Sequence, residues 1–107
     1  MFWKKKEGDE AVLRDREIVE ENVKRLDVVA AWLEALPNAA ARVKALTEAY
    51  RYVSPFGTDA AHKADSKIAD RIDDMKLAAQ KAVKNGETTE IDELIQRIKI
   101  LIREREL

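Results

Sequence analysis

The chain contains no cysteine, which excludes disulfide bonds, thiolate catalysis and cysteine-based zinc sites. Glycine and proline are scarce, with three and two residues in a chain of 107, so few positions interrupt a helical pattern. The longest uncharged apolar run, residues 28–33, is far shorter than the roughly 20 residues that a membrane-spanning helix needs. The N-terminus has no hydrophobic stretch typical of a secretory signal. We therefore expect a cytoplasmic protein.

An excess of one charge is also missing. The 20 basic and 21 acidic residues give a net charge of −1, and both signs are spread evenly along the chain. A protein that neutralises many phosphates needs a basic surface, so we expect no nucleic-acid partner. The sequence contains no phosphate loop, dinucleotide fingerprint or zinc-ligand spacing, and we expect no cofactor.

Helix-forming residues dominate, and apolar residues at 46% are too frequent for a disordered chain. Helical periodicity predicts four segments, long, short, long and short, over residues 9–36, 39–53, 59–85 and 90–106. Short connections make each pair of consecutive helices an antiparallel hairpin. The predicted fold is an all-α, antiparallel bundle of four helices. Residues 1–8 form a short basic and aromatic tail, and residues 9–107 form a single domain.

The ends of these helices follow from local signals. Asp9, Asn38 and either Thr58 or Asp59 are predicted N-caps, and the pair Thr89 and Asp92 resembles a capping box. Pro37 ends the first helix, and Gly86 supplies the left-handed conformation that ends the third. Phe56, in the connection between the hairpins, is expected to close one end of the core.

The predicted core is centred on residues 26–36, LDVVAAWLEAL, which are apolar nearly all round a helix. We expect other helices to pack against this segment from several directions. The first helix would be about 40 Å long, whereas a compact domain of this size has a diameter nearer 34 Å. The long helices therefore favour an elongated bundle or self-association. Each predicted helix carries an apolar seam, meaning the apolar residues that lie along one of its faces. The seams of the first and second helices are Val12, Val19, Val23, Leu26, Ala30 and Leu33, and Ala39, Val43, Leu46, Tyr50 and Val53. Those of the third and fourth are Ala61, Ala64, Ile68, Ile72, Met75, Ala79 and Ala82, and Ile91, Leu94, Ile95, Ile98, Leu101 and Ile102.

The polar stripe of the third helix is the one candidate for catalysis or metal binding, with residues Asp59, His62, Ser66, Asp70 and Asp73. A hydrolase would use Ser66 as nucleophile and His62, one turn away, as base. No glycine-rich elbow supplies an oxyanion hole, and the single histidine cannot complete a di-iron motif. We expect a solvated helix face here, and no catalytic, cofactor or metal residues in the chain.

Several apolar residues fall outside the seams. They are Val28, Ala31, Ala35, Ile100 and Leu107, together with Phe2 and Trp3 at the N-terminus. Such residues mark an interaction surface or a second contact direction inside the bundle. The favoured function is a small non-enzymatic helical module that forms homo-oligomers or binds another helical protein. An alternative is a peripheral membrane adaptor in which Phe2, Trp3, Lys4, Lys5 and Lys6 contact anionic lipid. A hydrolase or metal site at His62 is the third hypothesis.

Overall fold

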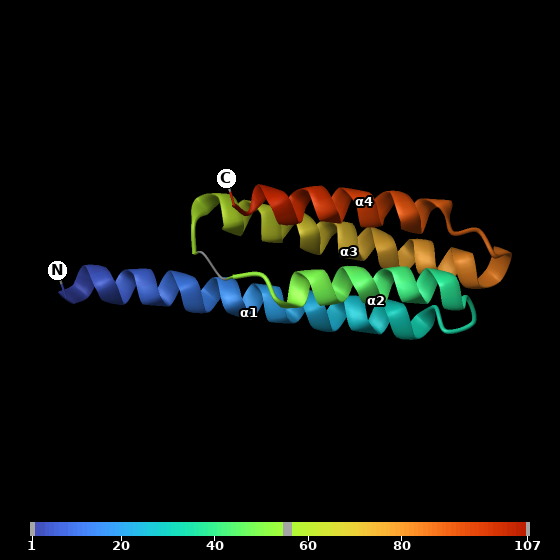
Figure 1. The fold of residues 1–107 in the computed structure, drawn as a ribbon, viewed down its shortest axis with the longest axis horizontal. Helices are drawn as coiled ribbons and strands as arrows, with labels where there is room; N and C mark the ends of the chain where they lie inside the picture. Colours follow the sequence, from blue (N-terminus) through green and yellow to red (C-terminus); the bar gives the residue numbers. More distant parts are fainter. Residues whose placement is uncertain (1, 55–56, 107) are drawn as a thin grey trace.

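The described part of the chain folds as four α-helices that form two hairpins packed side by side (Figure 1). The computed structural model describes residues 2–54 and 57–106, with side chains from residue 10 onward. Helix α1 spans Phe2–Trp32 and α2 spans Pro37–Arg51, while α3 spans Asp59–Asn85 and α4 spans Thr89–Glu104. The all-α class and the bundle are as predicted.

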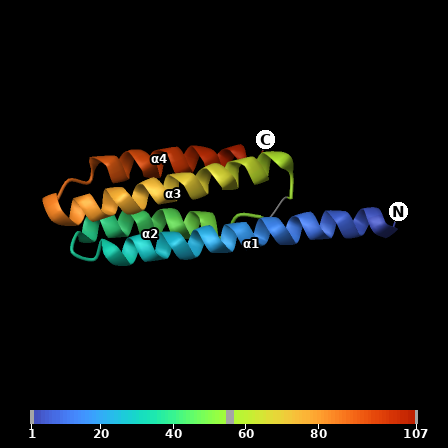
Figure 2. The same cartoon turned by 180° about the vertical axis from the view of Figure 1, so that it is seen from behind.

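Each hairpin is antiparallel, and the contacts between the hairpins join helices that run the same way (Figures 1 and 2). Helix α1 packs on α2 and α3, and α4 packs on α3 and α2. Exposed ion pairs connect these neighbours at Arg25–Asp73, Arg51–Asp27 and Arg42–Asp92. Exposed pairs of this kind contribute at most about 1 kcal/mol each, so the core must supply most of the stability.

Both predicted ends of α3 are correct. The hydroxyl of Thr58 accepts a hydrogen bond from the Ala61 N–H at 3.1 Å, which satisfies one of the free donors of the first turn. Gly86 adopts φ 76° and donates its N–H to the Ala82 carbonyl at 2.7 Å. A residue with a Cβ is disfavoured in this left-handed conformation, which is why glycine ends the helix.

The predicted boundaries of the other helices need correction. Helix α1 begins at Phe2 rather than at Asp9, because Lys4 to Glu7 are good helix formers and Gly8 costs only about 1 kcal/mol inside a helix. Helix α1 ends at Trp32, before Pro37 is reached, so the prediction that Pro37 ends this helix is wrong. Pro37 is instead the first residue of α2, and Leu36, not Asn38, is the N-cap residue.

Helix α4 begins one residue earlier than predicted, at Thr89, and Thr88 at its N-cap makes no side-chain capping bond. The predicted capping box is therefore absent. Asp92 instead accepts a hydrogen bond from Arg42 Nε at 2.7 Å.

The apolar core runs along the inner faces of all four helices and agrees with most of the predicted seam positions. Small residues predominate on α3, where five of the buried positions are alanine, and they let neighbouring backbones approach closely. The fully buried large side chains include Leu26, Leu33, Leu46, Ile68, Ile72, Met75, Ile91 and Ile98. Val12, Val53, Leu101 and Ile102 are half-buried at the margins of the core.

The bundle is elongated, with dimensions of 57 × 21 × 18 Å. The N-terminal turns of α1 project beyond the other three helices (Figures 1 and 2). The chain leading into α3 passes close to α1 near the start of this projection. A Cβ added to Gly57 would lie 2.9 Å from the backbone of both Ala11 and Val12. The long first helix is therefore accommodated in an elongated bundle, one of the two outcomes expected from its length. Phe56 lies outside the described residues.

Candidate functional site

A cluster of buried polar side chains lies in the core at the end of the bundle from which α1 projects. It comprises Asp15 and Asn22 from α1, Tyr50 from α2, Asp65 from α3 and Arg105 from the turn after α4. All are at most 3% exposed, although charged residues are rarely buried so completely. The cluster thus joins side chains of α1, α2 and α3 to the turn after α4.

Arg105 is the centre of the cluster. Its Nε donates to Asp65 Oδ1 at 2.9 Å, and its Nη2 donates to Asp15 Oδ2 at 2.7 Å. Its Nη1 donates to the carbonyl of Ser54 at 3.0 Å, in the segment that connects the hairpins. A buried charge is tolerated only when it is paired and hydrogen-bonded, and Arg105 meets both conditions.

Tyr50 and Asn22 complete the network on the other side of Asp65. The Tyr50 hydroxyl donates to Asp65 Oδ1 at 2.7 Å. Asn22 Nδ2 donates to the Tyr50 hydroxyl and to the Asp65 carbonyl, each at 3.1 Å. Burial is the main cause that raises the pKa of the Tyr50 phenol, and the Asp65 carboxylate raises it further. Tyr50 is therefore a fixed hydrogen-bond donor.

Burial also raises the pKa of the Asp65 carboxyl, to about 7, and its hydrogen bond with Asp15 acts in the same direction. The Tyr50 hydroxyl and the Arg105 guanidinium favour the ionised form and oppose this rise. A carboxyl with such a pKa can exchange a proton near neutral pH. The surrounding side chains are closed to solvent, however, so the cluster offers no room for a substrate.

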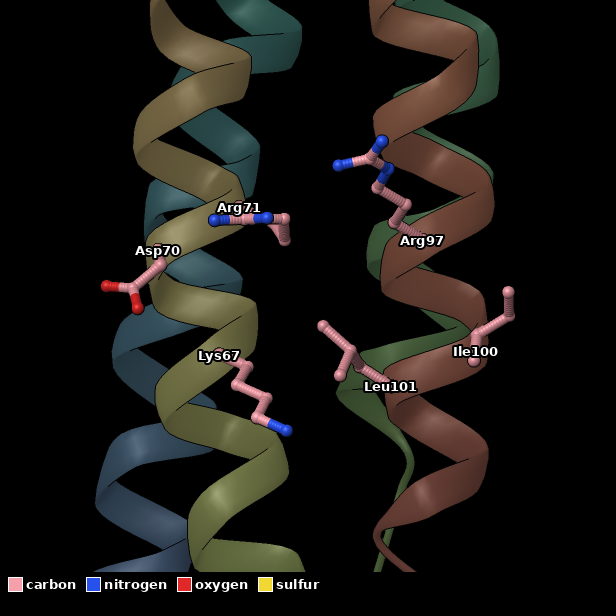
Figure 3. Close-up of a pocket in the computed structure, with 6 residues that line it drawn as sticks. All are labelled: Lys67, Asp70, Arg71, Arg97, Ile100 and Leu101. Atoms are coloured by element: carbon pink, nitrogen blue, oxygen red, sulfur yellow. The ribbon is translucent and has the colours of Figure 1, made fainter.

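A second site is open to solvent, in a groove between α3 and α4. Six residues line it, namely Lys67, Asp70, Arg71, Arg97, Ile100 and Leu101, around a volume of about 410 Å³. Figure 3 shows Lys67 and Arg71 of α3 and Arg97 and Leu101 of α4 pointing between the two helices, with Asp70 and Ile100 turned outward at its margins. We call this hollow the α3–α4 groove.

The α3–α4 groove combines positive charge with apolar surface. Arg71 is paired with Asp74 at 3.2 Å. Within the described residues Lys67 and Arg97 form no ion pair. Ile100 is 55% exposed beside them. The groove can therefore hold an apolar group that carries negative charge.

The predicted interaction residues are divided between two surfaces. Val28 and Ala31 are exposed on the C-terminal half of α1, together with Trp32, and Ala35 is exposed in the turn after this helix. Ile100 belongs to the α3–α4 groove. Helices α2 and α3 cover two sides of this half of α1 and leave its third side open. The side chains of Phe2 and Trp3, and residue Leu107, lie outside what the structure describes.

The polar stripe of α3 does not assemble a catalytic arrangement. Asp59, His62 and Ser66 are exposed, and in the described part of the chain no hydrogen bond joins the His62 side chain to the other two. Asp73 pairs with Arg25 instead. Among the residues with described side chains, no three histidine or carboxylate groups gather closely enough to hold a metal ion.

The buried cluster was missed by the sequence analysis, although a signal for it exists. Core positions of α1 follow a spacing of four and three residues through Val19, Leu26 and Leu33, and Asp15 and Asn22 fall on the same spacing. Asp65 falls on the equivalent spacing of α3, between Ala61 and Ile68, and Arg105 continues the spacing of α4 into the turn after it. A strict heptad interpretation would have placed these polar residues inside the bundle.

The chain matches no protein-family model, and no curated protein and no solved structure shows significant similarity to it. Across residues 2–54 and 57–106, none of the helices combines the length and the apolar character needed to cross a lipid bilayer.

Proposed function

We propose that the protein is a small non-enzymatic interaction module that binds an acidic amphipathic helix in the α3–α4 groove. The observation that carries this proposal is the combination of exposed Ile100 with Lys67 and Arg97, two cations that have no ion-pair partner among the described residues. A helix with an apolar side chain flanked by carboxylates supplies both complementary features.

Helix α1 of a second copy carries this chemistry, and we propose it as the occupant. Leu13 is 54% exposed, and the exposed carboxylates of Glu10 and Glu17 lie one turn to either side of it. Helix α1 also projects from the bundle, so this end of it is accessible to another molecule (Figure 2). Self-association would cover both the apolar side chain and the unpaired cations.

Light scattering after size exclusion, over a concentration series, tests self-association. We expect a mass above that of the monomer, and a shift to monomer in Ile100→Glu and in Lys67→Glu. The matched controls are Ala41→Glu and Lys44→Glu, which change exposed residues of α2. Mixing Lys67→Glu with Glu17→Lys should restore a mixed assembly, because the two charges are exchanged. A wild-type monomer at every concentration would exclude a second copy as the occupant.

The apolar surface of α1 is a further contact region in this proposal. Val28 and Trp32 are 45% and 44% exposed, and Trp32 lies beside Val83 of α3. Val28→Glu should weaken assembly or partner binding if this surface takes part. If neither Val28→Glu nor Ile100→Glu changes assembly or partner capture, both surfaces are assigned wrongly.

The projection of α1 favours one second candidate, a peripheral membrane adaptor. The projecting segment carries the sequence FWKKK, which combines aromatic and cationic residues suited to an anionic lipid surface. Flotation with vesicles of anionic lipid tests this function. Equal flotation of the full chain and of a chain that lacks residues 1–6 would contradict it.

A further inference from the structure

The buried cluster contains two carboxyl groups and only one cation. The guanidinium of Arg105 bonds to both Asp15 and Asp65, which brings the two carboxyls close together at 3% and 0% exposure. With both carboxyls ionised, the cluster would carry a net negative charge in an interior of low dielectric constant. Two buried carboxylates at such a short separation favour binding of one proton.

The hydrogen bonds of Asp65 show where this proton is needed. Asp65 Oδ1 accepts from both Arg105 and Tyr50, whereas Asp65 Oδ2 is buried and accepts from no N–H or O–H group of the described residues. The neighbouring Asp15 carboxyl raises the pKa of Asp65 as well. Two carboxyl groups can hydrogen-bond to each other only if one of them is protonated.

Every element around Asp65 contributes a group that faces this proton. Helix α1 contributes Asp15 and Asn22, α2 contributes Tyr50, and the turn after α4 contributes Arg105. The segment after α2 adds a backbone carbonyl, from Ser54, which bonds to Arg105. Only Asp15 opposes ionisation of Asp65 electrostatically, while Arg105 and the Tyr50 hydroxyl favour it.

We propose that Asp15 and Asp65 form a proton-binding site that locks the turn at Arg105 to α1 and α3 and makes this end of the bundle sensitive to pH. With the proton bound, the cluster is neutral overall and its hydrogen bonds are complete. Loss of the proton leaves two carboxylates in contact around one guanidinium, and repulsion weakens the lock. This regulation is independent of the proposed function.

The direction of the pH effect follows from proton binding. An unfolded aspartate has a pKa of about 3.9, whereas the folded Asp65 has a pKa of about 7. Below about pH 4 both states are protonated, and the stabilisation is complete. Between these two pKa values the folded state binds more protons, so stability falls as pH rises, and the loss is complete above about pH 7. The folding equilibrium constant should fall by up to about tenfold per pH unit in this interval.

Urea unfolding of the wild type and of Asp65→Asn at pH 5 to 8 tests the proposal. Asparagine resembles the protonated acid, since its amide can donate to Asp15 while its oxygen accepts from Arg105 and Tyr50. Relative to this variant, the folding equilibrium constant of the wild type should fall as pH rises to 7. Asp70→Asn, an exposed aspartate on the same helix, should keep the pH dependence of the wild type.

Carboxyl-carbon NMR of the wild type gives an answer even if Asp65→Asn does not fold. We expect one of the two buried carboxyls to titrate near neutral pH. Amide hydrogen exchange of residues 102–106, corrected for intrinsic rates, should increase as this proton is lost. Two carboxyls that are already ionised at pH 5, or the same pH slope in the wild type and Asp65→Asn, would overturn the proposal.

Discussion

Asp15 and Asp65 share a single guanidinium, since Arg105 donates from Nη2 to the first and from Nε to the second. The two aspartates belong to α1 and α3, which are in different hairpins, and the arginine follows α4. Buried ion pairs of this kind contribute less to stability than their distances suggest, because desolvation offsets the attraction. Removing only one residue of such a pair, however, lowers the stability of the protein strongly.

Replacing Arg105 by methionine should therefore destabilise the protein strongly. The substitution keeps much of the side-chain volume but leaves Asp15 and Asp65 buried without a cation. We expect the free energy of unfolding at pH 7 to fall by about 3–5 kcal/mol. Urea denaturation would measure this loss. Arg103→Met, at an exposed position of α4, is the matched control and should change stability by less than about 0.5 kcal/mol. Similar losses in the two variants would argue against a central role for Arg105.

Tyr50 and Tyr52 provide a second matched comparison. Tyr50→Phe removes the hydroxyl that bonds to Asp65 and Asn22, and should cost about 1–3 kcal/mol because both buried partners lose a bond. Tyr52 is 78% exposed, so Tyr52→Phe should have almost no effect. Thermal or urea unfolding of both variants at one pH distinguishes them. A neutral Tyr50→Phe would show that water replaces the hydroxyl.

Gly57 and Gly86 both have positive φ angles, but their surroundings differ. An alanine Cβ at Gly57 would lie 2.9 Å from the backbone of α1, whereas at Gly86 nothing lies within 4 Å. Gly86→Ala should lower the free energy of unfolding only by the cost of holding a residue with a Cβ in the left-handed conformation, about 1–2 kcal/mol. Gly57→Ala should cost more, because the connection or α1 must also move. Equilibrium unfolding of the two variants gives this difference directly, and equal losses would contradict the close approach.

Truncating a large buried side chain of the apolar core should destabilise the protein. Ile72 is completely buried on α3, and Ile72→Ala should lower the free energy of unfolding by about 2–5 kcal/mol. Leu77 on the same helix is 59% exposed, so Leu77→Ala serves as its control and should cost far less. Comparable losses at both positions would mean that Leu77 is covered by another molecule under the conditions of the experiment.

The sequence predicted best those features that depend on neighbouring residues. The bounds of α3 follow from Thr58 and Gly86, whose conformations are fixed by a few local bonds. The apolar seams also follow, because helical spacing alone determines which residues share a face. The start of α1 shows the limit of such local signals, because Asp9 has the side chain of a capping residue, yet the helix continues through Gly8 to Phe2.

The buried cluster depends on contacts between distant segments, and this is why it was not predicted. Nothing near Asp65 in the sequence indicates that Arg105 will neutralise it. Composition also misleads, since most aspartates in so charged a chain lie on the surface. The heptad spacing of Asp15, Asn22 and Asp65 places them in the core, but only the fold shows which groups they bond to there. The α3–α4 groove has the same origin, because Lys67 and Arg97 approach each other only after the second hairpin forms.

The division of the buried cluster between the hairpins has a consequence for a cleaved chain. The first hairpin holds Asp15, Asn22 and Tyr50, and the second holds Asp65 and Arg105. A single connection, residues 52–58, joins them. If the chain were cut within this connection, each of the two fragments would contain polar groups of the buried cluster whose hydrogen-bond partners lie in the other fragment. Such fragments should recombine with each other rather than with copies of themselves, which makes the chain a natural candidate for a split reporter.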